Sequence, residues 1–188
     1  TYNYARIEQT GSPAYLAGDF DVQIDYTLPG GALSATQYHV PLRFQVSFPT
    51  GATGVSMQAE YYVSGGVNYA RGCTQIDGGS WTCGTAVSSP PTTGKLRLVR
   101  KGATQEMYYW NGSAWTLLRQ ITNGTTQPAT AIYAIAYVQR NEVVTLLRTR
   151  VDNYQVNHAP AWSAGKIFGG LSFDGVNDYA GMGDPSIV

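Results

Sequence analysis

Hydrophobic and polar residues alternate along most of the chain. Residues 19–28, DFDVQIDYTL, are the clearest case, because every second residue from Phe20 to Leu28 is apolar or aromatic and the residues between them are polar. Residues 42–48 repeat this period. Side chains of a β-strand point alternately to its two faces, so the pattern predicts half-buried strands. Comparable runs lie at residues 55–63, 67–72, 94–101, 104–110, 115–120, 130–139 and 143–156.

Turn-forming residues separate these runs. Asn111-Gly112, between two aromatic-rich segments, is the strongest hairpin signal. No window has the apolar stripe of a helix. Many antiparallel strands at regular spacing predict an all-β fold, either a sandwich, a barrel or a jelly roll.

The pattern changes near residue 157. Residues 157–164 contain Pro160 and small side chains and interrupt a strand-like run, so they are interpreted as a linker. Residues 165–188 have room for only two short strands, which is too little to bury a core. We therefore expect a β-sandwich over residues 1–156, followed by a linker and a tail. The tail either docks on the sandwich or begins a second domain.

Composition and charge narrow the classes of partner. Twelve Lys and Arg balance twelve Asp and Glu, and charged residues make up only 13% of the 188 residues. Nucleic acids and anionic membrane surfaces are therefore not expected as partners. No apolar run is long enough for membrane insertion as a helix. The 22 glycines, the 14 tyrosines and the low charge are typical of extracellular or cell-surface all-β proteins.

The two cysteines lie close together in the sequence. Cys73 and Cys83 enclose nine residues that include Gly78 and Gly79. This spacing across a glycine turn favours a local disulfide, worth about 3 kcal/mol by the chain-entropy relation. Two unrelated buried thiols are the alternative. A disulfide would fit an oxidising compartment.

Several segments resemble a known superfamily. GDFDVQIDYTL, GKLRLVRKGATQEMYYWNGSAWTLL and VTLLRTRVDNYQV are similar to strands of the concanavalin-A-like lectin and glucanase superfamily, over residues 15–156. The resemblance implies an antiparallel two-sheet β-sandwich, the jelly roll. Its members include sugar-binding lectins, glycoside hydrolases and structural adhesion domains, so it does not choose among functions. GKIFGGLSFDGVNDY, in residues 165–181, resembles the start of a laminin-G-like module.

Catalytic carboxylates are sparse in the sequence. Laminarinase-like hydrolases of the superfamily carry Glu and Asp at alternate positions of one strand, ExDxE, because the acid and the nucleophile must share a face. None of the four glutamates here has a carboxylate two residues away. Asp19, Asp21 and Asp25 do share a strand face, which is the ordinary solvent side of an alternating strand. No GxSxG, P-loop or HExxH motif occurs, so we expect no enzymatic activity.

Aromatic residues are the better candidates for ligand binding. Sugar rings have apolar faces that stack on Trp and Tyr, while planar polar side chains bind the hydroxyls. Trp81 lies in the glycine-rich segment between the cysteines, where core packing explains it least. Tyr108 and Trp110 share a strand face, and Tyr69 lies near a glycine turn. These four residues are the predicted ligand-binding set, although half or more of the aromatic rings of a sandwich belong to its core.

Calcium is the only metal ion that the resemblance suggests. In several members a carboxylate on the last strand helps to bind a structural Ca²⁺, and Asp152 in RVDNYQV resembles that position. Asp19 would lie nearby if the first and last strands pair. Such a site needs six or more oxygen ligands, many of them backbone carbonyls. A single Asp therefore neither establishes nor excludes a calcium site.

Two functions compete on these observations. The first is a non-catalytic extracellular carbohydrate-binding or adhesion module of a larger secreted bacterial protein, whose partner is a glycan. The second is a structural assembly domain of a cell-surface or filament protein, which binds neighbouring copies of itself through the C-terminal tail as a homo-oligomer. A hydrolase or lyase with an unfamiliar site is a third reading, and the missing carboxylate motif weighs against it.

Overall fold

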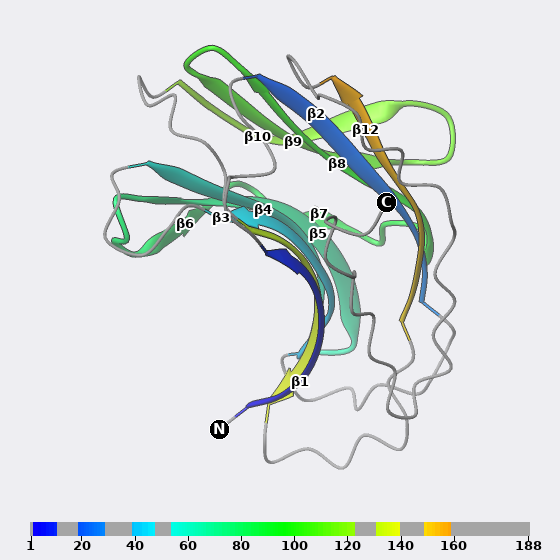
Figure 1. Cartoon of the computed structure of the whole chain (residues 1–188). Coiled ribbons are helices and arrows are strands. Elements are labelled where there is room, and N and C mark those ends of the chain that lie inside the picture. The colour runs from blue at the N-terminus through cyan, green and yellow to red at the C-terminus, as the bar shows by residue number, and fades with distance from the viewer. Residues whose placement is uncertain are drawn as a thin grey trace, which may run out of the picture.

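The chain folds into two β-sheets that face each other across a hydrophobic core (Figure 1). The computed structural model describes residues 2–10, 19–28, 39–47, 54–122, 131–139 and 149–158. All strand pairs within these residues are antiparallel. The antiparallel two-sheet sandwich expected from the alternating pattern and from the resemblance is therefore confirmed.

The larger sheet has seven strands, in the order β1-β11-β3-β4-β5-β6, with β7 also paired to β5. Its strands are β1 (Tyr2–Thr10), β11 (Ala131–Gln139), β3 (His39–Ser47), β4 (Val55–Ser64), β5 (Val67–Ile76), β6 (Trp81–Cys83) and β7 (Val87–Ser88). The smaller sheet has five strands, in the order β10-β9-β8-β2-β12. Its strands are β10 (Trp115–Thr122), β9 (Thr104–Trp110), β8 (Thr93–Lys101), β2 (Phe20–Thr27) and β12 (Arg150–His158). The described part of the chain contains no helix, and so none that could cross a membrane.

Three strands were not expected from the sequence. The first, β1, lacks a clean alternation of apolar and polar residues, and β6 and β7 are too short to show a period. At the other end, β12 extends to His158, two residues into the predicted linker 157–164. The rest of that linker and the tail 165–188, with its laminin-G resemblance, lie outside the described residues.

Alternation in β2 corresponds to burial in the sandwich core. Phe20, Val22, Ile24 and Tyr26 are each no more than 2% exposed. They pack against apolar side chains of the larger sheet, including those of Leu42, Phe44, Met57 and Tyr61. Full burial of one such side chain stabilises the fold by about 1.5–3 kcal/mol.

Two tyrosine hydroxyls in the core bond to backbone carbonyls near Pro90. Tyr26 donates to the Pro91 carbonyl at 2.8 Å, and Tyr61 donates to the Pro90 carbonyl at 3.3 Å. Burial raises the pKa of both phenols, that of Tyr61 to about 12. Both phenols therefore remain neutral donors under ordinary conditions, and they fix the segment before β8 against the core.

The predicted hairpin at Asn111-Gly112 is confirmed. Four residues connect β9 to β10, and the Asn111 side-chain oxygen accepts hydrogen bonds from the backbone N–H groups of Ser113 and Ala114, both at 2.9 Å. Gly112 has a φ of 103°, which L side chains rarely adopt. The turn is thus held by the asparagine side chain together with the glycine conformation.

The larger sheet is curved (Figure 1). Its concave side is turned away from the smaller sheet, so the face that does not contact the core is the concave one. The sandwich therefore presents two different outer faces, and the predicted ligand-binding residues can be assigned to one or the other.

Candidate ligand-binding face

Polar and aromatic side chains gather on the outer face of strands β3 to β6. The register places Arg43, Glu60 and Arg71 in one cross-strand row. The next row contains Gln45, Gln58 and the two cysteines, and the row after that contains Ser56, Gln75 and Trp81. On the other side of the arginine row, Tyr62 lies opposite Tyr69. We call this set of side chains the concave face.

Glu60 lies at the centre of the concave face and is fully buried. Arg43 donates from Nε and Nη2 to Oε2 at 3.0 Å. Arg71 donates from Nε and Nη2 to Oε1 at 2.6 Å, and Gln58 Nε2 donates to Oε2 at 2.9 Å. The carboxylate is therefore satisfied by hydrogen bonds from charged donors, which are the stronger kind. Because the arginine side chains are 21% and 25% exposed and the Glu60 side chain is 0% exposed, solvent reaches the arginine side chains and not the carboxylate.

The two tyrosines extend this network. Tyr62 and Tyr69 stack with ring centroids 5.0 Å apart, and the Arg71 guanidinium lies 4.4 Å from the centre of the Tyr62 ring. Burial is the main cause of the raised pKa of Tyr62, and the positive charge of Arg71 opposes it. A pair of stacked aromatic rings with a cation over one of them therefore lies on the outer face of the sheet, where the alternating pattern alone requires only polar side chains.

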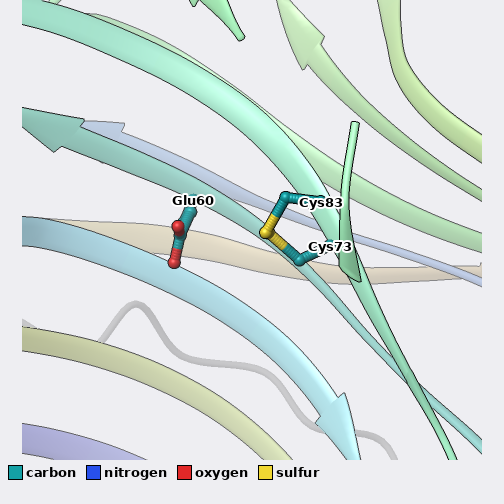
Figure 2. Close-up of side chains that lie close together, drawn as sticks. All are labelled: Glu60, Cys73 and Cys83. Atoms are coloured by element: carbon teal, nitrogen blue, oxygen red, sulfur yellow. A yellow bond between two sulfur atoms is a disulfide. The ribbon is translucent and has the colours of Figure 1, made fainter. Parts of the chain in front are cut away.

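The predicted disulfide is confirmed. Cys73 and Cys83 are bonded to each other and lie directly opposite in the pairing of β5 with β6. Figure 2 shows Glu60 beside this bridge, and the carboxylate oxygen and the two sulfurs lie within 4.8 Å of one another. The cluster does not suit a metal ion, because the sulfurs are bonded together and the Glu60 oxygens already bind two arginines.

Trp81 begins strand β6, although the glycine-rich segment between the cysteines reads in the sequence as a loop. The turn before it is short, with Asp77 at φ 49° and Gly78 at φ 70°, and Gln75 Nε2 donates to the Gly79 carbonyl at 2.8 Å. The chain therefore returns at once to pair with β5, and Trp81 lies half-buried opposite Gln75 on the concave face. The Asp77-Gly78 pair was a sequence signal for this tight turn.

Tyr108 and Trp110 lie on the outer face of the smaller sheet. The Trp110 ring packs edge-on against Trp115, with centroids 5.5 Å apart. The Arg97 guanidinium lies 5.4 Å from the centre of the Trp115 ring and 5.8 Å from that of Tyr108. Burial is the main cause that raises the pKa of Tyr108 to about 12. The four predicted ligand-binding aromatics are therefore divided: Trp81 and Tyr69 lie on one outer face, Tyr108 and Trp110 on the other.

The structure does not bring Asp19 and Asp152 together. Strands β2 and β12 do pair, but Asp152 lies opposite Asp25, six residues along β2 from Asp19. At the rise of a strand this separation is about 20 Å. Each carboxylate also has a protein donor, since Arg150 Nε donates to Asp152 at 2.6 Å and the Gly102 N–H donates to Asp19 at 2.6 Å.

Sequence reasoning missed the arginine and glutamate row. In the sequence Glu60 is one of four scattered glutamates, and nothing there connects it with Arg43 or Arg71. Their contacts to Glu60 span 17 and 11 residues, and they become visible only when the register of β3, β4 and β5 is known. The alternation of β4 places Glu60 on the polar side of the strand with Ser56 and Gln58, so the sequence carries no signal that this carboxylate is buried.

Comparisons with known proteins give distant structural likenesses. No family model matches the chain, and no curated protein matches its sequence. A functionally unknown protein from Saccharomyces cerevisiae has a TM-score of 0.49 at 13% identity, over 84% of this chain and 74% of that one. The CBM2 module of the evolved Dit of Lactobacillus casei BL23 phage J-1 has a TM-score of 0.48 at 10% sequence identity. The match covers 72% of this chain and 60% of that one. CG-16, a homodimeric agglutinin from chicken liver, has a TM-score of 0.44 at 11% sequence identity. The match covers 81% of this chain and 100% of that one. None of these likenesses assigns a function to this chain.

Proposed function

We propose that this chain is a non-catalytic carbohydrate-binding module of a larger secreted protein, and that it binds a glycan on the concave face. One observation carries the proposal. Trp81 and the Tyr62–Tyr69 stack lie on the same outer face as two arginines that a buried carboxylate holds in place.

The chemistry of this face suits a sugar. The apolar faces of a pyranose ring stack on Trp and Tyr, and its hydroxyls exchange hydrogen bonds with planar polar side chains. The row of Arg43, Glu60 and Arg71 separates Trp81 from Tyr69, which lie six strand residues apart by register, or about 20 Å. That length favours a ligand of several sugar units in preference to a single one.

Glu60 is poorly suited to acid or base catalysis. Both of its oxygens accept hydrogen bonds from arginines, and its side chain is 0% exposed. A general acid or base must reach the proton that it transfers, and the Glu60 oxygens are buried and already bound by the two arginines. Glu60 therefore serves to position the arginines, in agreement with a binding role.

The experiment compares two tryptophans on opposite faces. Binding is first sought on an array of polysaccharides, and affinity for the best glycan is then measured by calorimetry. Trp81→Ala and Tyr69→Ala should each weaken binding by about 1–3 kcal/mol, the scale of one well-packed aromatic contact. Trp110→Ala is the matched control and should leave the affinity unchanged.

Two outcomes would contradict the proposal. Loss of binding in Trp110→Ala with full binding in Trp81→Ala would move the site to the smaller sheet. Absence of binding to every polysaccharide would favour the assembly function instead, and self-association measured by light scattering would then be the next test.

A further inference from the structure

Strand β6 is attached to the sandwich by little besides the disulfide. It has three residues, Trp81 to Cys83, and none of them is buried. Within the part of the chain that the structure describes, β6 pairs only with β5. Hydrophobic burial, which holds the longer strands in place, therefore contributes little to the position of β6.

The disulfide acts on the same face as Trp81. Trp81 and Cys83 are two residues apart on one strand, so both side chains point to the concave face. The bridge fixes Cys83 directly to Cys73, which is 0% exposed on β5. Fixing Cys83 also fixes the register of β6 and thus the place of the Trp81 ring.

We propose that Cys73 and Cys83 are positioning residues for Trp81, and that reduction of their disulfide releases β6 and removes Trp81 from the glycan site. This inference rests on the proposed function for its effect on binding. Its structural half, the release of Trp81, stands independently of any ligand.

The reduction balances with a dithiol as the reductant. A thiolate of the dithiol attacks the sulfur of Cys83, which is the more exposed of the two cysteines. The S–S bond breaks, the Cys73 sulfur leaves with the electron pair and takes up a proton, and a mixed disulfide forms at Cys83. The second thiol of the dithiol then displaces Cys83, which is protonated in turn. The protein gains two electrons and two protons, and the dithiol becomes a disulfide.

The surroundings favour release once the bridge is open. The segment before β6 is a tight turn built on Asp77 and Gly78, and the segment after it starts at Gly84, whose N–H donates to the Gly72 carbonyl at 2.9 Å. Within the described residues, these contacts and a ladder of three residue pairs with β5 hold β6 besides the bridge. A strand of three residues without a buried side chain has too few interactions to offset the conformational entropy of ordering it.

The test uses the full chain with dithiothreitol as the dithiol. Quenching of tryptophan fluorescence by acrylamide is measured in the oxidised and reduced protein and in Trp81→Phe, so that the difference reports on Trp81 alone. We expect reduction to raise the Trp81-dependent quenching constant at least twofold and to weaken glycan binding at least tenfold. The far-ultraviolet β-sheet spectrum should not change. Cys73→Ala/Cys83→Ala should reproduce the reduced state without a reductant.

The outcomes separate this inference from the proposed function. If quenching rises on reduction but no glycan binds in either state, the positioning role holds and the proposed function fails. If a glycan binds equally well in both states, the redox inference fails and the proposed function holds. Unchanged quenching would overturn the inference. Loss of the β-sheet spectrum on reduction would overturn it as well, because the bridge would then stabilise the whole sandwich.

Discussion

Substitution of Glu60 tests whether its ion pairs with Arg43 and Arg71 stabilise the fold. Glu60→Gln keeps the size of the side chain but removes the negative charge between Arg43 and Arg71. The two guanidinium groups then face each other without a counter-charge, and Gln58 loses a charged acceptor. Removing one partner of a buried ion pair typically costs about 3–5 kcal/mol.

The partial exposure of the arginines lowers this cost. Their side chains are 21% and 25% exposed, so water can replace part of the hydrogen bonding and charge stabilisation that the carboxylate supplies. We therefore expect Glu60→Gln to reduce the free energy of unfolding by about 2–4 kcal/mol, which corresponds to a fall in Tm of about 5–15 °C for a domain of this size. Urea denaturation followed by tryptophan fluorescence measures the change.

Two further variants complete the experiment. Glu106→Gln is the matched control, because Glu106 lies on the outer face of the smaller sheet and accepts hydrogen bonds from neutral donors, Gln120 Nε2 at 2.8 Å and the Tyr108 hydroxyl. It should cost under about 1 kcal/mol. The triple variant Arg43→Met/Glu60→Leu/Arg71→Met should recover most of the stability, since it removes the unpaired charges together with the carboxylate.

Either of two results would show that unpaired charge is not what destabilises the variant. A loss under about 1 kcal/mol in Glu60→Gln would mean that water satisfies both arginines without the carboxylate. A triple variant as unstable as Glu60→Gln would mean that the loss comes from packing and not from unpaired charge.

Three other changes have expected outcomes. The pKa of Tyr61, raised to about 12 from an ordinary value of 10.0, means that the neutral phenol stabilises the fold fully below pH 10. That contribution is lost as the pH rises toward 12, so the urea midpoint should fall across this interval. Gly72→Ala should destabilise by about 1–3 kcal/mol in thermal unfolding, because an added Cβ would lie 2.8 Å from the Cβ of Arg119 and 3.0 Å from that of Met107. Asn111→Ala should cost about 1–2 kcal/mol in the same assay, since it removes the acceptor of two backbone N–H groups.

The sequence predicts the strands better than it predicts their assembly. Residues 19–28 alternate because one face of β2 packs on the core, and a period of two is a local property. By contrast, Trp81 and Trp110 have similar local surroundings in the sequence, with glycines and turn residues nearby, yet they lie on opposite faces of the sandwich. The difference arises from the sheet that each strand joins, which long-range pairing decides.

The candidate site was predictable only in part. The disulfide follows from the short spacing of Cys73 and Cys83, and Trp81 could be singled out because core packing did not explain it. The role of Glu60 could not be found in the same way, since its partners are brought to it by the register of neighbouring strands. The alternation in β4 puts Glu60 at an ordinary solvent-face position, so the sequence does not show that its carboxylate is buried and needs partners.

The pairing of β1 with β11 has a consequence for synthesis of the protein. Among the described strands, β1 pairs only with β11, which is more than a hundred residues further along the chain, and β11 also fills the edge of β3. The N-terminal strand therefore leaves the ribosome long before its partner exists, and such high contact order slows folding. Until residue 139 has emerged, the outer edge of β3 and both edges of β1 can pair with other chains. Nascent or truncated chains that end before β11 should consequently aggregate or require a chaperone, whereas chains that extend through β12 should not.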